Sequence, residues 1–210
     1  MKVQRFFLAV SLILLVSSCA YTRVTSFKDN ERAAGKTYAK IAILAPLSDL
    51  ATRSAIEKAF VLKFNEKGVS ATPSLSIIPP TRNPSKEEIE AKLREGGYDA
   101  LLFVDLTDSY RENVATPGYA TTLWGKSGAV TTYSGGNTAS KPRTKFRIQL
   151  LDLASYQNVW VSSTFTTGNV WAGPETMAQS LAEKTVSKLK DDGLIKEITP
   201  VSAPAQKQED

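Results

Sequence analysis

Apolar positions along the chain alternate between short strand-like runs and spacings of three to four residues that are typical of helices. In the first half, these patterns predict, in order, strand 38–44, helix 49–67, strand 69–78, helix 85–95 and strand 98–106. Pro73 interrupts the second of these strands and indicates an edge position or a bulge. The third strand has an unbroken apolar centre at 101–104, so we expect it at the centre of a sheet, covered on both faces.

Residues 107–143 depart from this regularity because they are rich in Gly, Ser and Thr. Within them, 119–124 and 129–133 predict an exposed hairpin, and we expect the remainder, above all 134–141, to be mobile. Alternating apolar positions then predict an antiparallel pair at 145–153 and 159–167. A final helix is predicted over 174–191, with Pro174 near its first turn and Gly193 just past its end.

The order of these elements predicts the fold class. Three strands separated by two helices favour right-handed crossovers onto one sheet, and the later hairpins add antiparallel strands to it. We therefore expect an α/β fold in which α and β elements are mixed. Its sheet should be mixed parallel and antiparallel, with about five to seven strands and three helices packed on it.

Residues 1–18 have the three parts of a secretory signal peptide: a basic start, an apolar stretch at 6–16, and two serines. The apolar stretch is too short to span a bilayer as a helix, which takes roughly 20 residues. Residues 15–19, Leu-Val-Ser-Ser-Cys, resemble the bacterial lipobox, in which the cysteine is lipidated and becomes the mature N-terminus. The alternative is an ordinary secreted protein that is cleaved near Ala20 and keeps a free thiol.

The lipobox resemblance implies that Cys19 carries acyl chains such as palmitate, which bind the protein to a membrane. Ala20 follows in place of an aspartate, and by resemblance to enterobacterial sorting rules this implies the periplasmic face of the outer membrane rather than the inner membrane. We expect a signal peptide at 1–18, followed by a lipidated N-terminus and tether at 19–37, with or without an edge strand at 21–25. One α/β domain at 38–195 should follow, with a flexible insertion at 107–143. Residues 196–210 are expected to form a disordered tail.

Composition narrows the classes of function. The chain has 42% hydrophobic and 22% charged residues, which is typical of a globular domain. It has no histidine and one cysteine, which excludes histidine-based catalytic pairs, zinc sites of histidine or several cysteines, and internal disulfides, and we expect no metal and no cofactor. Without residues 1–18 the chain keeps 24 basic and 21 acidic residues, and this small excess, together with an envelope location, argues against nucleic acid as a partner.

Four segments resemble one group of bacterial envelope lipoproteins. They are Lys40-Ile41-Ala42-Ile43-Leu44, Gly97-Tyr98-Asp99-Ala100-Leu101-Leu102, Gln149-Leu150-Leu151-Asp152-Leu153 and Asn158-Val159-Trp160. With the lipobox, they are similar to lipoproteins whose domain resembles the N-terminal domain of TolB, a group that includes CsgG-like, LpoB-like and uncharacterised families. The resemblance covers about 38–194 and implies the fold. Members of the group assemble secretion pores or activate wall synthases, so the resemblance does not select one task.

Several carboxylates are candidates for acid or base chemistry. Asp105 and Asp108 lie at the C-terminal end of the predicted central strand, where sites of α/β proteins commonly form, and Arg111 is placed to orient an anion beside them. Asp99 and Asp152 are further candidates. The alternative is that these aspartates cap turns, since no histidine or nucleophile accompanies them. We therefore predict that the protein is not an enzyme, with a carboxylate-dependent hydrolase of cell-wall material as the alternative.

The segment 107–143 is the better candidate for binding. Its aromatic and basic residues predict contact with sugar rings or a protein partner, and we single out Tyr119, Trp124, Lys126 and Tyr133, with Lys141 and Arg143 beside them. The alternative is that these aromatics cover the core. Residues 124–127 resemble the end of a phosphate-binding loop, but Ala120 stands where that loop requires glycine, so we exclude it.

Together these observations predict a non-enzymatic lipoprotein of the outer membrane. It would bind the membrane through Cys19, and a protein partner or an envelope polymer such as peptidoglycan through 107–143, in the assembly or maintenance of the cell envelope. A third possibility is a structural subunit of an oligomeric envelope or secretion complex. The oligomeric state stays open.

Overall fold

The computed structural model describes residues 19–81, 85–115, 119–125 and 128–196, with the backbone alone over 119–125 and 128–134. The predicted signal peptide at 1–18 and all of the predicted tail except Lys196 lie outside the described residues. Among the described helices, none combines the length and the apolar composition that a membrane span requires.

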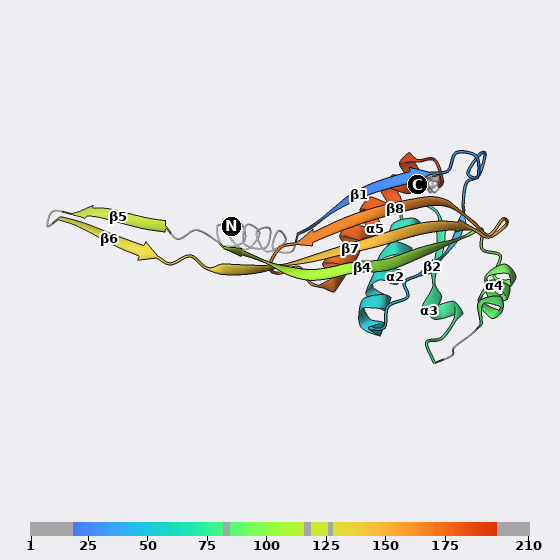
Figure 1. Ribbon diagram of the computed structural model, residues 1–210, viewed down its shortest axis with the longest axis horizontal. Coiled ribbons are helices and arrows are strands. Elements are labelled where there is room, and N and C mark those ends of the chain that lie inside the picture. The colour runs from blue at the N-terminus through green and yellow to red at the C-terminus, as the bar shows by residue number, and fades with distance from the viewer. Residues whose placement is uncertain (1–18, 82–84, 116–118, 126–127, 197–210) are drawn as a thin grey trace, which may run out of the picture.

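A six-stranded mixed sheet forms the centre of the domain (Figure 1). Its strand order is β1-β8-β7-β4-β2-β3. The strands are β1 (Ala20–Lys28), β2 (Lys40–Leu44), β3 (Ser70–Pro73), β4 (Ala100–Ala115), β7 (Thr138–Asp152) and β8 (Gln157–Gly168). The strand β2, next to the edge strand β3, runs parallel to β3 and β4, and the other pairs are antiparallel. The predicted mixed α/β sheet is therefore confirmed.

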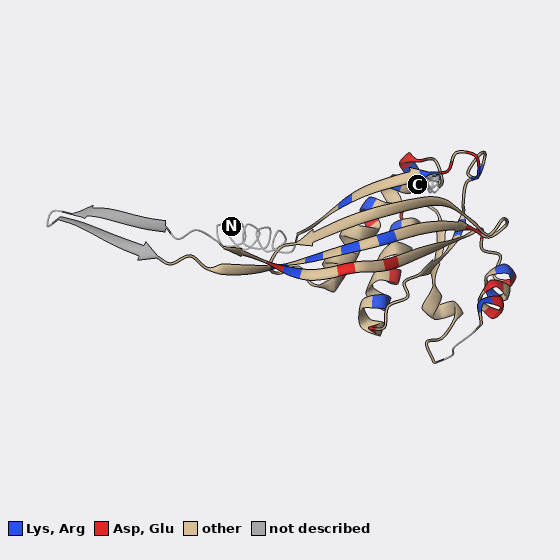
Figure 2. Ribbon diagram, in the orientation of Figure 1, with Lys and Arg blue, Asp and Glu red and all other residues tan. Residues whose placement is uncertain are grey.

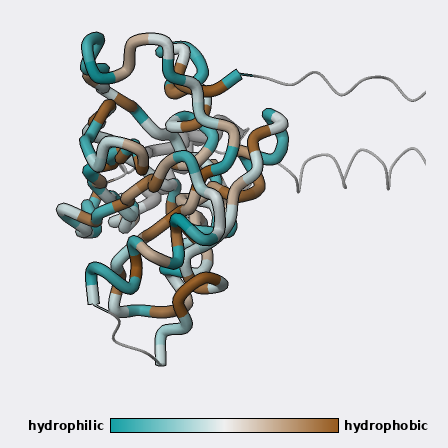
Figure 3. The backbone as a smooth tube through the Cα atoms, turned by 90° about the vertical axis from the view of Figure 1, so that its right-hand side faces the viewer, coloured by the Kyte–Doolittle hydropathy of each residue, from teal (hydrophilic) through white to brown (hydrophobic). Residues whose placement is uncertain are grey.

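Two long helices cover one face of this sheet. They are α2 (Leu50–Asn65) and α5 (Pro174–Asp191), and their buried faces share one hydrophobic cluster with alternate residues of the strands, including Phe60, Leu181, Leu102, Ile148 and Trp160. On the opposite face, α4 (Lys86–Glu95) covers only the β2–β4 end, where Leu93 packs against Ala42 and Leu101. Figure 3 shows the resulting layers, with polar positions mostly along the periphery. The remaining strands of that face have no helix over them in the described residues (Figure 1).

The second predicted strand is wrong beyond Pro73. The strand β3 ends there, and Ser74–Ile77 forms a one-turn helix, α3, in addition to the three predicted helices. The cause is a distant side chain: the buried Glu57 carboxylate accepts a hydrogen bond from the Ser74 hydroxyl at 2.6 Å and another from the Leu75 N–H at 3.1 Å. These bonds turn the chain away from the edge of the sheet.

The predicted flexible insertion at 107–143 is wrong at both of its ends. The strand β4 continues to Ala115 and β7 begins at Thr138, and their pairing runs unbroken to Ala115 opposite Thr138 apart from one register shift near Leu106. The hairpin predicted inside this segment is confirmed as β5 (Tyr119–Gly125) and β6 (Gly128–Ser134), which form a separate two-stranded sheet. We call residues 111–142 the arm, and Figure 1 shows it projecting from one end of the sheet, well beyond the helices.

The segment 19–37, predicted to be a tether, is largely part of the sheet. The whole of β1 pairs with β8, from Ala20 opposite Gly168 to Lys28 opposite Trp160, so the possible edge strand at 21–25 exists and is longer than expected. A turn after Asp29 and a hydrogen bond from the Tyr38 N–H to the Leu194 carbonyl then lead the chain into β2. Within the described residues, the sheet therefore starts at the residue after Cys19.

Candidate functional site

Cys19, the predicted lipidation site, is exposed and is fixed in position by the backbone. Its carbonyl accepts a hydrogen bond of 3.0 Å from the N–H of Asn169, the first residue after β8. The next residue, Ala20, is the first of β1 and pairs with Gly168. An acyl group on Cys19 would thus be attached to the sheet itself.

Cys19 lies at the end of the sheet from which the arm projects. Ala20 of β1 is opposite Gly168 of β8. The preceding residue of β8, Thr167, pairs with Arg143 of β7, and Arg143 pairs with Tyr110 of β4. The arm begins at the next residue of β4. The start of β1 and the base of the arm therefore lie side by side, as Figure 1 also shows.

The arm carries few charges. Between Glu112 and Lys141 the sequence has one charged residue, Lys126, whereas 22% of the whole chain is charged. Three of the four predicted partner-binding residues lie in its hairpin: Ala120 of β5 is opposite Tyr133 of β6, beside Tyr119, and Trp124 is opposite Ala129 near the hairpin end. The backbone thus brings Tyr119 and Tyr133 to neighbouring positions, with Trp124 closer to the turn. Lys126, the fourth, lies outside the described residues.

Charged pairs cross from β4 to β7 where the arm joins the sheet (Figure 2). Glu112 forms an ion pair with Arg143, Asp108 lies 3.0 Å from the Lys145 ammonium, and Asp105 is directly opposite Arg147. The hydrogen bond and the charge of Asp108 raise the pKa of Lys145. Each acid stands on β4 and each base on β7, so these cross-strand pairs stabilise the pairing of the two strands.

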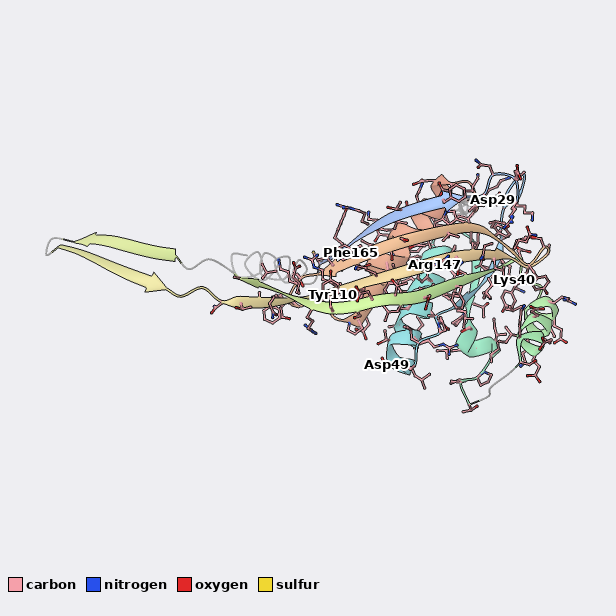
Figure 4. The ribbon with its side chains drawn as sticks, viewed as in Figure 1. Asp29, Lys40, Asp49, Tyr110, Arg147 and Phe165 are labelled. Atoms are coloured by element: carbon pink, nitrogen blue, oxygen red, sulfur yellow. The ribbon has the colours of Figure 1, made fainter. Side chains whose placement is uncertain are left out.

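Aromatic rings accompany these bases on the face of the sheet that α2 and α5 leave open. The Arg143 guanidinium lies 5.4 Å from the centre of the Phe165 ring, and the Lys145 ammonium lies 5.7 Å from the centre of the Tyr110 ring. Figure 4 labels Tyr110, Arg147 and Phe165 on neighbouring strands of this face. Arg143, predicted as a flanking residue of the binding segment, therefore has a fixed position at the base of the arm.

The predicted catalytic carboxylates do not come together. Asp105 and Asp108 lie in the middle of β4, because that strand continues past Leu106, and not at a strand end as expected. Asp99 lies at the end of the sheet opposite the arm, where it accepts hydrogen bonds from the N–H groups of Ala39 and Lys40 at 3.0 and 2.8 Å. These bonds connect the start of β2 to the start of β4, which is a structural role.

Asp152 lies at the same end and is also held by neighbours. It accepts hydrogen bonds from the Lys36 ammonium at 2.7 Å and from the backbone and hydroxyl of Ser155. Burial would raise the pKa of Asp152, but these hydrogen bonds outweigh it and hold the pKa below its ordinary value. Burial and the charge of Asp152 raise the pKa of the nearby Tyr38 hydroxyl. Within the described residues, no group of three or more potential metal ligands forms.

The sequence patterns did not identify an exposed apolar turn beside Cys19. Residues Val170 and Trp171, directly after Asn169, are 39% and 77% exposed, and Tyr21 on β1 is 61% exposed. The signal was present as a second Asn-Val-Trp tripeptide, at 169–171, that falls outside any predicted strand or helix. An exposed tryptophan beside a lipid-attachment site is suited to the membrane interface, where Trp is enriched.

A cavity of about 350 Å³ lies behind this turn, between the base of the arm and the N-terminal parts of α2 and α5. Apolar residues from these elements line most of it: Ile56, Pro142, Phe146, Ala172, Met177 and Leu181. Arg111, which the sequence suggested as an anion-orienting residue, belongs to this lining and not to a carboxylate site. A second hollow, of about 460 Å³, is open between α3 and α4 and contains Leu50, Ile77 and Pro79.

Comparisons with known proteins give structural similarity only. No family model and no curated protein matches the chain, so the resemblance to TolB-like domains stays a prediction. Among solved structures, the chain is similar to the PelC dodecamer from Paraburkholderia phytofirmans, with a TM-score of 0.49 and 16% identity over 80% of this chain and 96% of that one. It is also similar to lipoprotein GNA1162 from Neisseria meningitidis, with a TM-score of 0.41 and 14% identity over 73% of this chain and 99% of that one.

Proposed function

We propose that the protein is a non-enzymatic lipoprotein of the outer membrane, with its domain on the periplasmic face, whose arm binds a protein partner at the level of the membrane. The observation that carries this proposal is the common location of Cys19 and the base of the arm at one end of the sheet. An anchor at that end directs the arm toward partners in or beside the bilayer, rather than toward the far side of the periplasm.

The architecture of the arm supports a binding role. Its outer part is a hairpin of two strands that pair only with each other among the described residues. A two-stranded hairpin without a third strand or a helix against it is at best marginally stable in water. A partner that adds a strand or an apolar surface would supply the missing contacts, which is a common mode of recognition.

The low charge of the arm supports a protein partner in preference to an anionic polymer. The cores of protein interfaces are depleted in charged residues and enriched in Tyr and Trp, and residues 113–140 of the arm have one charge together with Tyr119, Trp124 and Tyr133. Recognition of an anionic envelope polymer would favour several basic side chains. Two basic residues of this region, Arg143 and Lys145, lie instead where the arm joins the sheet and are paired with acids.

Hydrolysis of cell-wall material is the weaker candidate. The aspartates on which it depended are dispersed, and Asp108 and Asp152 each have a lysine partner. Incubation of the purified protein with isolated sacculi tests it, and cleavage that Asp108→Asn abolishes would restore it. A structural subunit of an oligomeric complex is compatible with the arm proposal, since another copy of the chain can serve as the partner.

Site-specific photo-cross-linking in cells tests the proposal. A photoreactive amino acid at position 121 in β5 should capture a membrane-associated protein, whereas the same amino acid at Leu62, a half-exposed position on α2, should not. A variant in which a short glycine-containing turn joins Glu112 to Lys141 should fold, incorporate labelled palmitate and lose the cross-linked species. Equal capture from both positions, or the absence of palmitate on the wild-type protein, would contradict the proposal.

A further inference from the structure

The cavity at the base of the arm is suited to an apolar ligand. Its walls come from three directions: Phe146 and Pro142 from β7, Ile56 from α2, and Met177 and Leu181 from α5. Apolar surface dominates this lining, and a volume of about 350 Å³ is within the range of small-ligand pockets. One polar atom, the hydroxyl oxygen of Thr144, is buried there without a hydrogen-bond partner among the described residues.

The cavity lies directly beside the lipid-attachment residue. Gly168, which pairs with Ala20, packs so closely that a Cβ atom there would lie 2.5 Å from Ala172, 2.8 Å from Pro142 and 2.9 Å from the Met177 sulfur. All three of these residues line the cavity. The backbone at Ala20 is therefore one strand away from the cavity wall, and Cys19 is the adjacent residue.

We propose that this cavity holds an acyl chain of the lipid group on Cys19. The inference depends on the lipidation of Cys19 that is part of the proposed function. Burial of methylene groups in an apolar cavity is favourable, and a chain attached to Cys19, whose neighbour Ala20 is one strand away from the wall, is already present at a high effective concentration. The remaining acyl chains would enter the bilayer and bind the protein to it.

The fixed backbone at Cys19 favours its own acyl chain over a chain from a bilayer lipid. The hydrogen bond from the Asn169 N–H to the Cys19 carbonyl keeps the attachment point beside the turn at 169–173. This turn lies between β8 and the start of α5. Ala172 and Gly173 of this turn also line the cavity. The exposed Val170 and Trp171 of the same turn would meet the membrane interface when this end of the domain is held against the bilayer.

Intramolecular cross-linking of the lipidated protein tests the inference. Cells that express the full-length protein are fed a palmitate analogue with a diazirine near the end of its chain, irradiated, and the purified protein is digested and analysed by mass spectrometry. We expect the Cys19 peptide to be joined through its acyl chain to peptides that contain Phe146 or Met177. This mapping uses the wild-type protein, so it does not depend on a variant that folds.

A filling variant and a matched control make the result specific. Ala172→Trp places an indole in the cavity wall and should reduce the cross-link to the Met177 peptide about tenfold while the label on Cys19 remains, because two bulky groups cannot share the space. Ala154→Trp makes the same change in the turn at the opposite end of the sheet and should leave the cross-link unchanged. Circular dichroism of both variants verifies the fold.

Each of the other outcomes overturns a different part of the proposal. A labelled Cys19 whose acyl chain is cross-linked only to lipids or to other proteins overturns the cavity inference and leaves the lipoprotein proposal intact. Cavity peptides that carry phospholipid adducts, with none joined to Cys19, overturn the assignment to the protein's own acyl chain. A protein without any label on Cys19 overturns the proposed lipidation, and the inference with it.

Discussion

Glu57 lies fully inside the domain, at the point where α2, α3 and the end of β2 meet. One carboxylate oxygen accepts hydrogen bonds from the Ala45 N–H, the Arg53 guanidinium and the Ser74 hydroxyl, and the other accepts one from the Leu75 N–H. A buried charge with this many donors is fully satisfied, so its removal leaves the Arg53 cation without its counterion and several donors without their acceptor.

We predict that Glu57→Ala lowers the free energy of unfolding by about 3–5 kcal/mol, the usual effect of breaking a buried ion pair. Urea denaturation of the purified domain measures it. Glu66→Ala is the matched control, because its carboxylate pairs with Lys63 near the end of the same helix and is 48% exposed. That change should stay within about 0.5 kcal/mol of the wild type. Equal losses in the two variants would show that the network is not the cause.

Asp192, just after α5, joins three other elements. Its carboxylate accepts hydrogen bonds from the indole of the buried Trp160 at 2.8 Å, from the Ser26 hydroxyl at 2.9 Å and from the Lys188 ammonium at 2.7 Å. Burial would raise the pKa of Asp192, but the hydrogen bonds from Lys188, Trp160 and Ser26 together lower it. The carboxylate therefore stabilises the folded state when it is ionised.

The sign of this shift gives a pH prediction. The contribution of Asp192 is fully present above the ordinary aspartate pKa of about 3.9 and is lost as the pH falls through the lower pKa of the folded state. Asp192→Asn should therefore unfold at a lower urea concentration than the wild type at pH 7. The difference should shrink when both proteins are measured near pH 3. A difference that stays constant or grows toward acid pH would contradict the shift.

The two Asn-Val-Trp tripeptides show why single residues resist prediction from local sequence. Val159 and Trp160 of the first are buried, with exposures of 0% and 1%, whereas Val170 and Trp171 of the second are 39% and 77% exposed. The first lies in β8, where Asp192 accepts the hydrogen bond of the indole, and the second lies in a turn. The difference depends on partners far away in the chain, which no local pattern contains.

For helices and strands, the sequence predicted the bounds that depend on residues close together in the chain. The helix α5 has its expected bounds, because Pro174 begins it and Gly193 ends it with a positive φ of 73°, a conformation that glycine adopts readily. The end of β3 and the helix α3 were not predictable in this way, because they depend on Glu57. The outer part of β4 was missed because its residues are polar, and its strand structure comes from pairing with β7.

The candidate site was predictable to a similar degree. The lipobox identifies Cys19 from five consecutive residues, and the Gly, Ser, Thr and aromatic composition identifies the hairpin. Their common location at one end of the sheet depends on pairing between β1 and β8. Paired residues of these strands, such as Ala20 and Gly168, lie more than a hundred residues apart in the sequence. The cavity depends on the same pairing and on the packing of α5.

Gly168 provides a test of the junction between β8, the arm and α5. A Cβ atom at this position would lie within 3.0 Å of side chains of Ala172, Pro142 and Met177. Pro142 belongs to β7 and Met177 to α5, and these two elements cannot both move away. Gly168→Ala should therefore destabilise the protein by about 1–3 kcal/mol through overpacking. Gly135→Ala, at a position with open space, should leave the stability unchanged or slightly higher. Thermal unfolding of both variants measures the two effects. A larger loss of stability in Gly135→Ala than in Gly168→Ala would contradict the packing argument.

The molecule as a whole has two parts that we expect to differ in stability. The sheet and its helices bury an extensive core that includes Leu102 and Ile148, both with 0% exposure, whereas β5 and β6 form a sheet of two strands. Elements with few buried contacts open more often than core strands. Stability of the arm is therefore expected to come from what it binds.

Amide hydrogen exchange tests this expectation on the full-length protein. In detergent, the amides of β5 and β6 should exchange at least about tenfold faster than those of Leu102 and Ile148. In native membrane vesicles, where the proposed partner would be present, β5 and β6 should become protected while the core is unchanged. Strong protection in detergent would mean that the hairpin is stable alone, and the structural reason for a partner would be lost.

The hydrogen bond between Asn169 and Cys19 has a consequence for the working range of the lipidated molecule. Lipoproteins with a long unstructured leader can search the space between membrane and wall, with a radius that the leader sets. If Cys19 is acylated as we propose, the described residues after it contain no such leader, because the first described strand starts at the next residue. Encounters of the protein would then be confined to a thin shell above the lipid headgroups, and any component that it engages would have to come to that shell.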